Sequence, residues 1–244
     1  TVACDSSAIV DGLSQAAATA SCTIRVVVEM DTGGGRVGTQ SPADTLALAR
    51  HIDQSSSLDF MGVMTYPSNE RARPFLDEVR DLANRAGLPL HIISGGGTGS
   101  EEISKSLGCT ETRIGSYAWE GMTRVGKRED LNPERCPLRM AVTVVSTSRP
   151  GQAIVDAGMK AFTSYPPIPH GYCLEYPEIF FKSMSVEHGH LDLSASSHDL
   201  KVGEVLSFIP LHGGMTTNLH DRLYAIRDGE VVEEWAVEGR GRAQ

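Results

Sequence analysis

Continuous apolar runs alternate with amphipathic stretches along the first half of the chain. The run at residues 23–30 (TIRVVVEM) is almost wholly β-branched and apolar, which is typical of a strand buried on both faces. Four other runs are interpreted as strands, at residues 2–4, 58–64, 90–93 and 112–117. Between them, apolar residues recur at helical spacing in segments at residues 6–18, 41–52, 74–86 and 102–107. This alternation predicts parallel βα units.

Short strands separated by turn residues replace this pattern after about residue 127. Seven such strands are expected, at residues 140–145, 152–155, 172–176, 179–183, 204–210, 223–227 and 231–235. Glycines, prolines and the pair Asp228-Gly229 mark the turns between them. The chain is therefore expected to contain an α/β domain at residues 1–127 and a mainly antiparallel β domain at residues 128–244.

Composition and charge argue against several classes of function. The 244 residues carry a net charge of −9, whereas a nucleic-acid-binding surface needs a basic excess. No apolar run is long enough to span a bilayer, and no secretion signal is visible at the start of the sequence. The five cysteines are scattered without a CxxC pair, which indicates reduced thiols in a cytoplasmic protein.

Two glycine-rich segments follow predicted strands. Residues 29–38 (EMDTGGGRVG) place Asp31 and Arg36 at the carboxyl end of a strand, where ligands bind in parallel βα folds. A flexible glycine turn with a surface arginine explains this pattern equally well. Residues 94–100 (SGGGTGS) offer backbone N–H groups and hydroxyls that suit a phosphate. No Lys-Ser/Thr pair follows, so the segment is not a P-loop, and a tight turn is the alternative.

Two further segments carry charged and titratable side chains. Arg113, in residues 110–117 (TETRIGSY), is expected to point inward at the end of the last strand, or else to pair with a neighbouring acid. Residues 187–190 (EHGH) and 212–221 (HGGMTTNLHD) are both assigned to β-strands, and their histidines suit a metal site or an acid/base pair. For any one histidine, a simple hydrogen bond is the plainer explanation.

The order of these segments, with Thr65-Tyr66-Pro67 between the two glycine-rich ones, resembles a known family. It is similar to the later strands of the pyridoxal-phosphate (PLP) barrel shared by alanine racemases and D-threonine aldolases. Residues 149–160 (RPGQAIVDAGMK), 187–193 (EHGHLDL) and 212–221 resemble segments of the D-threonine aldolase/D-serine dehydratase family, the last two from its C-terminal β domain. The resemblance implies an α/β fold, part of a TIM-type (β/α)8 barrel, followed by an antiparallel β domain.

The resemblance also assigns roles to individual residues. Arg36 would lie beside the phenolic oxygen of the cofactor or the substrate carboxylate, Tyr66 against the pyridine ring, and Arg113 opposite the pyridine nitrogen. An arginine there keeps that nitrogen largely unprotonated, which weakens the ring as an electron sink. The other cofactor-binding residues, chiefly around the phosphate, would be Gly96, Gly97, Thr98, Gly115, Ser116 and Tyr117. His188 and His212 would lie at the substrate end as candidate catalytic acid/base residues.

The sequence departs from the family pattern at the metal site. The family commonly has His-x-Cys or His-x-Asp as ligands of a divalent metal, and here Gly214 stands at the second position. Glycine offers no side chain, and His212 alone is a poor site because metal ions usually take several protein ligands. A tightly bound metal is therefore disfavoured, and His212 is the remaining candidate ligand.

The second departure concerns the cofactor lysine. The family's Schiff-base lysine lies on the first barrel strand, upstream of the residues present here. The lysines of this sequence are Lys105, Lys127, Lys160, Lys182 and Lys201. A complete barrel takes about 250 residues, and residues 1–127 hold about half of one. We therefore expect that another chain or segment completes the barrel, or that this is a fragment of a longer gene product.

The leading hypothesis is a PLP-dependent lyase that acts on a small β-hydroxy-D-amino acid, by retro-aldol cleavage or by dehydration. The alternatives are an amino-acid racemase or deaminase on the same scaffold, and a non-catalytic fragment or split-chain subunit. A sugar-phosphate TIM-barrel enzyme is disfavoured because it would not explain the β domain. The related enzymes imply a homodimer. The sequence leaves open which D-amino acid is the substrate.

Overall fold

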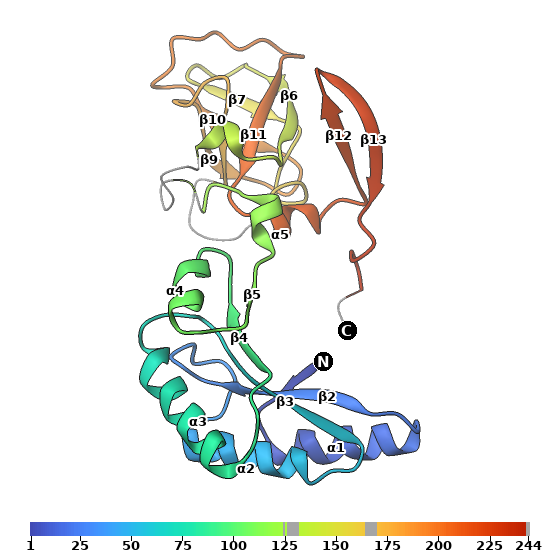
Figure 1. The fold of residues 1–244 in the computed structure, drawn as a ribbon. Coiled ribbons are helices and arrows are strands. Elements are labelled where there is room, and N and C mark those ends of the chain that lie inside the picture. The colour runs from blue at the N-terminus through green and yellow to red at the C-terminus, as the bar shows by residue number, and fades with distance from the viewer. Residues whose placement is uncertain (124, 126–131, 164–169, 243–244) are drawn as a thin grey trace. The chain divides into compact units, whose positions relative to one another are not determined.

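The computed structural model describes residues 1–123, 125, 132–163 and 170–242, which form two compact units, Thr1–Gly115 and Ser116–Gln244 (Figure 1). The predicted domain boundary, between residues 127 and 128, lies outside the described residues and stays a prediction. The first unit nevertheless ends earlier in the chain, directly after the last strand of its sheet.

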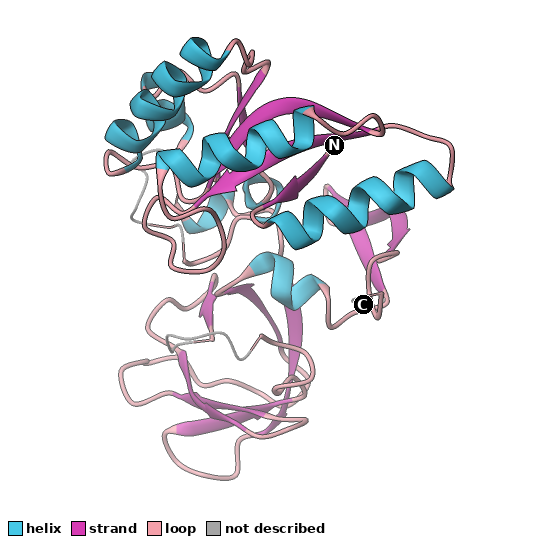
Figure 2. Cartoon of the chain, turned by 90° about the horizontal axis from the view of Figure 1, so that it is seen from below, coloured by secondary structure: helices cyan, strands magenta, loops and turns pink. Residues whose placement is uncertain are grey.

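The first unit is a five-stranded parallel sheet in the order β1-β2-β3-β4-β5. Its strands are β1 (Val2–Cys4), β2 (Ile24–Met30), β3 (Leu58–Thr65), β4 (Ile92–Gly96) and β5 (Glu111–Arg113). The connecting helices are α1 (Ser7–Thr19), α2 (Pro42–Asp53), α3 (Ala72–Ala86) and α4 (Glu101–Ser106). Because the strands are neighbours in sequence order, right-handed crossovers place the helices on one face. Figure 2 shows the long helices side by side in front of these strands.

The core of this unit lies between the sheet and the helices. Alternate residues of β2, Val26, Val28 and Met30, are buried in it. Ile52 of α2 and Leu76 of α3 are fully buried in the same cluster. Burying a side chain of this size contributes about 1.5–3 kcal/mol relative to leaving it exposed. This packing holds the strands in register, so that their carboxyl ends meet at one edge of the sheet.

The ends of the helices follow local sequence signals. Ser41 caps the start of α2: its hydroxyl accepts a hydrogen bond from the N–H of Asp44 at 3.1 Å, and Pro42 is the first helical residue. Gly87 ends α3 with a φ of 70°, a left-handed conformation that favours glycine. Both helix boundaries are as the sequence predicts.

The second unit is built on a six-stranded antiparallel sheet in the order β8-β11-β6-β7-β10-β9. Its strands are β6 (Met140–Ser146), β7 (Gln152–Val155), β8 (Gly171–Cys173), β9 (Phe180–Met184), β10 (Gly189–Asp192) and β11 (Val205–Pro210). The edge strands β8 and β9 contact each other, so the sheet curls into a near-barrel. Phe162, Phe181 and Phe208 fill it, with ring centroids 4.5–6.2 Å apart. The predicted fold class is confirmed: parallel βα units followed by an antiparallel β domain.

A separate hairpin, β12 (Arg222–Arg227) and β13 (Glu230–Ala236), follows the near-barrel. Three segments differ from the prediction. Glu187 and His188, which were assigned to a strand, lie in the turn between β9 and β10. The last strand of the first unit ends at Arg113 rather than at Tyr117, and a 3-10 turn, η1 (Ser116–Trp119), follows. The segment that begins at His212 is no strand but a short helix, α5 (Gly213–Thr217), because the ring of His212 caps it. Within the described residues, no helix is long and apolar enough to cross a membrane.

Candidate functional site

The carboxyl ends of the five parallel strands carry the glycine-rich segments that the sequence singled out. In residues 31–36, Oδ1 of Asp31 accepts hydrogen bonds from the N–H groups of Gly33, Gly34 and Gly35 at 2.9, 2.9 and 3.1 Å. These hydrogen bonds hold the pKa of Asp31 below its usual value, most strongly through Gly33. Asp31 therefore shapes the loop with one of its oxygens committed to the backbone.

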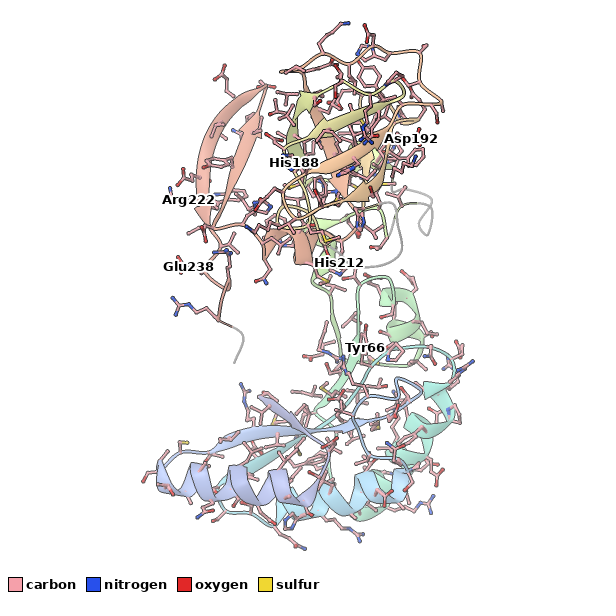
Figure 3. The ribbon with its side chains drawn as sticks, turned by 180° about the vertical axis from the view of Figure 1, so that it is seen from behind. Tyr66, His188, Asp192, His212, Arg222 and Glu238 are labelled. Atoms are coloured by element: carbon pink, nitrogen blue, oxygen red, sulfur yellow. The ribbon has the colours of Figure 1, made fainter. Side chains whose placement is uncertain are left out.

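This loop brings Arg36 to Tyr66. The guanidinium carbon of Arg36 lies 5.0 Å from the centroid of the Tyr66 ring, which is cation–π geometry. The same guanidinium approaches the carboxylate of Glu29 at 3.8 Å. Tyr66 directly follows β3 and is 44% exposed (Figure 3). An exposed aromatic face with a cation above it is therefore available at the edge of the sheet.

Arg113 lies near this ring, beside Gly96. Its Nη1 donates to Oγ of Ser94 at 2.6 Å, and its Nη2 donates to the backbone oxygen of Thr65 at 2.8 Å. A Cβ at Gly96 would lie 2.2 Å from Nη2 of Arg113 and 3.0 Å from Cδ2 of Tyr66. Since real Cβ atoms essentially never come under 3.0 Å, any larger residue at position 96 would force the guanidinium of Arg113 to shift.

Hydroxyl groups hold the loop after β4 in shape. Oγ of Ser100 donates to the backbone oxygens of Gly96 and Gly97 at 2.6 and 2.7 Å. The N–H of Gly96 donates to Oγ of Ser68 at 2.9 Å, and the N–H of Gly115 donates to Oγ1 of Thr98 at 3.2 Å. In this conformation the N–H groups of Gly96 and Gly115 are thus used inside the protein. Any phosphate held here would rely on other donors of the loop, or exchange with these bonds.

A depression of about 460 Å³ lies at the ends of β1 and β2. Asp5, Asp31, Arg36 and Gln40 are among the residues that line it. Oδ2 of Asp5 accepts from the N–H of Gly38 at 3.0 Å, so this carboxylate also supports the loop. The structure thus brings Arg36, Tyr66, Gly96, Gly97 and Arg113 together at one edge of the first unit, and of these residues Arg36 lines the depression.

The remaining predicted site residues belong to the second unit. Ser116 and Tyr117 form the start of η1, and Tyr117 is 56% exposed. His188 is exposed in the turn between β9 and β10, where its backbone oxygen accepts from the N–H of Ser185 at 2.9 Å. His212 is half-buried at the start of α5, and Figure 3 labels both histidines. They come from different segments of the near-barrel unit.

The imidazole of His212 has a defined role in the backbone. Its Nδ1 accepts a hydrogen bond from the N–H of Met215 at 3.2 Å. A neutral ring that accepts at Nδ1 carries its proton on Nε2, and that nitrogen then has no lone pair for a metal ion. Gly214 lies against the ring, since a Cβ there would be 3.6 Å from Cε1 of His212. A depression of about 450 Å³ beside Gly214 is lined by Met159, Thr163, Gly214, Met215, Asn218 and Leu219.

The donor set around His212 therefore does not resemble a metal site. Among the described residues, no group of three or more His, Cys, Asp or Glu side chains is placed to hold a metal ion. The lysines of the described residues are also remote from the expected pattern: Lys105 is exposed on α4, and Lys160, Lys182 and Lys201 belong to the second unit. Lys127 lies outside the described residues.

The sequence patterns do not reveal the two residues that hold Arg113, which are Ser94 and Thr65. Ser94 was assigned only to the glycine-rich loop, but it lies within β4 and is 2% exposed. Thr65 supplies a backbone oxygen, a group that side-chain patterns do not reveal. The usable signal was a serine at a buried strand position, because buried hydroxyls almost always have a hydrogen-bond partner.

Comparison with known proteins identifies both units. Residues 1–122 match the family described as "Alanine racemase, N-terminal domain", and residues 137–226 match the "Putative serine dehydratase domain". A D-threonine aldolase from Arthrobacter sp is 32% identical over 94% of this chain and 64% of its own length. A 3-hydroxy-D-aspartate aldolase from Paracoccus denitrificans (strain Pd 1222) is 30% identical over 99% of this chain and 67% of its own length.

A solved structure agrees with these matches. The crystal structure of a D-threonine aldolase from Filomicrobium marinum superimposes with a TM-score of 0.88 and 27% identity, over all of this chain and 70% of that one. The chain thus spans about two thirds of the length of the proteins that it matches. The predicted family resemblance is confirmed over both units.

Proposed function

Because the chain belongs to the family of D-threonine aldolase and 3-hydroxy-D-aspartate aldolase, we propose that it works as a PLP-dependent lyase on a β-hydroxy-D-amino acid. The observation that carries the proposal is the arrangement of Arg36, Tyr66, Gly96 and Arg113 at one edge of the parallel sheet. The comparisons support the family, whereas the substrate and the roles of individual residues are our inference.

The residues present fit a phosphorylated pyridine cofactor. The backbone of Gly96 comes close to both a guanidinium and an aromatic ring, since a Cβ there would crowd Nη2 of Arg113 and Cδ2 of Tyr66. All nitrogens of Arg113 are donors, so a pyridine nitrogen facing it must accept and stay unprotonated. When bound, PLP draws electrons from the α-carbon of an amino acid and weakens the bonds at that carbon. Tyr66 would lie against the ring, and Gly97 and Thr98 would contribute to holding the phosphate, because the N–H groups of Gly99 and Ser100 are bonded to Glu101 and Gly97.

The other residues would bind and orient the substrate. Arg36 is a fixed cation beside the ring of Tyr66 and suits a carboxylate or the phenolic oxygen of the cofactor. His212 is the candidate acid/base for expulsion of the β-hydroxyl; while its Nδ1 accepts from Met215 it could offer only a hydrogen bond from Nε2, and to act as an acid its ring would have to take up a second proton. Retro-aldol cleavage instead needs a base that takes the proton of the hydroxyl, for which exposed His188 is the candidate. We expect a protein whose chemistry does not depend on a metal ion at His212.

The test is a titration of the purified chain with PLP, followed by borohydride reduction and peptide mapping. A reduced adduct on a peptide would place the cofactor lysine in this chain. Bound but unreduced cofactor would support the expectation that the lysine comes from another segment or chain. Arg113→Ala should weaken binding strongly, whereas Arg85→Ala, on the exposed surface of α3, should not. No binding by the unaltered chain would refute the cofactor site.

The products then separate the reactions. Incubation with D-threonine should yield glycine and acetaldehyde if the protein is an aldolase, or a 2-oxo acid and ammonia if it is a dehydratase. Formation of L-allothreonine, the epimer inverted at Cα, without cleavage would instead support a racemase. The activity should be measured over a range of protein concentrations, because we expect a homodimer, which dissociates at low concentration. The homodimer is a proposal that rests on the resemblance, and the cytoplasmic location is a proposal that rests on the scattered cysteines.

A further inference from the structure

Ser94 connects two charged side chains at the end of the sheet. Its hydroxyl donates to Oε1 of Glu111 at 2.7 Å and accepts from Nη1 of Arg113 at 2.6 Å. These directions are fixed by chemistry, because a carboxylate only accepts and a guanidinium only donates. Ser94 pairs in register with Glu111, so Arg113 follows two residues further along the neighbouring strand, on the same face. The hydroxyl is therefore committed on both sides.

Arg113 is held at both of its terminal nitrogens. Nη2 donates to the backbone oxygen of Thr65 at 2.8 Å, while Nη1 is held by Ser94. The backbone of Gly96 approaches the guanidinium closely, since a Cβ there would lie 2.2 Å from Nη2. The backbone oxygen of Thr65 cannot be exchanged by mutation, so Ser94 supplies the side-chain part of this anchor. One hydroxyl thus sets the plane of the guanidinium beside Tyr66.

We propose that Ser94 is the positioning residue that fixes the guanidinium of Arg113 against the pyridine nitrogen of the cofactor. This inference rests on the proposed function and adds a residue to it. Removing the hydroxyl leaves Nη1 without its acceptor in a half-buried place, so Arg113 must turn toward another partner. The contact to the ring nitrogen should then weaken, while the contacts to the phosphate and to the ring face stay as they are.

Ser104 supplies a matched control. It is also a buried serine of the first unit, fully covered, and its Oγ has no hydrogen-bond partner among the described residues. Ser104→Ala therefore removes a hydroxyl of the same kind without removing a contact to Arg113. Ser94→Thr keeps the hydroxyl and serves as the conservative variant. A second pair of variants changes Glu111, which is more exposed than Ser94. Glu111→Gln keeps an oxygen that accepts from the hydroxyl of Ser94, whereas Glu111→Ala removes this acceptor.

The experiment measures binding of two cofactor analogues to the full chain by fluorescence titration. The first is 4-deoxypyridoxine 5-phosphate, which lacks the aldehyde and needs no lysine. The second is its counterpart with CH in place of the ring nitrogen. Ser94→Ala should bind the first analogue about three- to tenfold more weakly and the second nearly unchanged, because only the first has a nitrogen for Arg113. Ser104→Ala should bind both like the unaltered protein, and Ser94→Thr should restore most of the loss.

Equal weakening of both analogues in Ser94→Ala would overturn the inference, because a general loss of structure affects both. Unchanged binding of both would overturn it as well. If Ser94→Ala does not fold, Glu111→Ala is measured against Glu111→Gln, and the same selective loss is expected only for the alanine variant. If the unaltered chain binds neither analogue, the proposed function fails. The hydrogen bond between Ser94 and Arg113 is then tested by NMR of the Arg113 guanidinium. Its two Nη groups should give separate resonances in the unaltered chain and lose this separation in Ser94→Ala. Unchanged resonances would refute the proposed positioning role of Ser94.

Discussion

Gly96 is the position where a single methyl group should disturb the candidate site most. It is the last residue of β4, and its backbone passes directly under the guanidinium of Arg113 and the ring of Tyr66. In Gly96→Ala the new Cβ would start 2.2 Å from Nη2 of Arg113 and 3.0 Å from Cδ2 of Tyr66. Gly96 does not have a positive φ, so the effect is purely steric.

The magnitude follows from what Arg113 must give up. Moving the guanidinium away breaks its hydrogen bonds to Thr65 and Ser94, and hydrogen bonds to charged groups contribute about 1.5–3 kcal/mol each. Replacing glycine by alanine also lowers the conformational entropy of the unfolded chain, and this offsets about 0.4–1 kcal/mol of the loss in the free energy of unfolding. Water can replace part of the lost bonds because Arg113 is half-buried. We expect a net loss of about 1–3 kcal/mol in the free energy of unfolding of the first unit.

The assay is urea denaturation followed by far-ultraviolet circular dichroism, since α1, α2 and α3 belong to the first unit. Gly12→Ala is the matched control, because Gly12 lies in the exposed part of α1 and a Cβ there meets no atom within 4 Å. Alanine in a helix is more favourable than glycine by about 1 kcal/mol, so this variant should be more stable. The same chemical change is thus expected to have opposite signs at the two positions.

Two results would refute this reasoning. One is a Gly96→Ala protein as stable as the unaltered chain, which would mean that Arg113 and Tyr66 relax without loss. The other is a folded Gly96→Ala variant that binds 4-deoxypyridoxine 5-phosphate as tightly as the unaltered chain, which would mean that Arg113 and Tyr66 do not belong to the cofactor site. Loss of stability together with weaker binding supports the arrangement described above.

Three further predictions concern pH and metal ions. The hydrogen bonds from residues 33–35 lower the pKa of Asp31, so the stability that its carboxylate gives to the loop is present above pH about 4 and is lost as the pH falls through the lowered pKa. Amide hydrogen exchange at residues 33–35 should therefore speed up in acid. Asp31→Asn should show fast exchange already at neutral pH. Burial raises the pKa of the Cys173 thiol from 9.0 to about 11, so this thiol ionises at lower pH in the unfolded chain than in the folded one. The free energy of unfolding should therefore fall between pH 9 and 11. Denaturation curves of Cys173→Ala should show a smaller fall over this range, and a fall equal to that of the unaltered chain would contradict this account. Calorimetric titration with zinc or manganese should show no stoichiometric tight site at His212, and dialysis against a chelator should leave cofactor-analogue binding unchanged; a tight site that disappears in His212→Ala would show that Nδ1 releases the N–H of Met215.

Local sequence determined much of the fold. The apolar run of β2 predicts its own burial, and the pair Ser41-Pro42 and Gly87 mark helix ends through contacts within one turn of the chain. Such signals are readable because the interacting groups lie close in sequence. The prediction was wrong at His212, where strand-like neighbours conceal a helix cap made by the ring itself.

The general position of the candidate site was also a consequence of the sequence. Parallel strands have their carboxyl ends at one edge, so the segments after β2, β3, β4 and β5 had to converge. This places Arg36, Tyr66, Gly96 and Arg113 in one region without any knowledge of coordinates. The domain boundary after residue 127 and the roles of Ser116 and Tyr117 remain predictions.

Only the tertiary structure decided which atoms meet within that region. Arg113 is anchored by Ser94 and by the backbone of Thr65, from strands 19 and 48 residues away in the chain. Such pairs depend on strand register and side-chain conformation, which change by a whole face when a strand slips by one residue. The sequence alone determined the parallel sheet, the β domain and the edge where the site lies. The hydrogen bonds that orient the site arise from packing between distant segments, and for that reason only the folded structure revealed them.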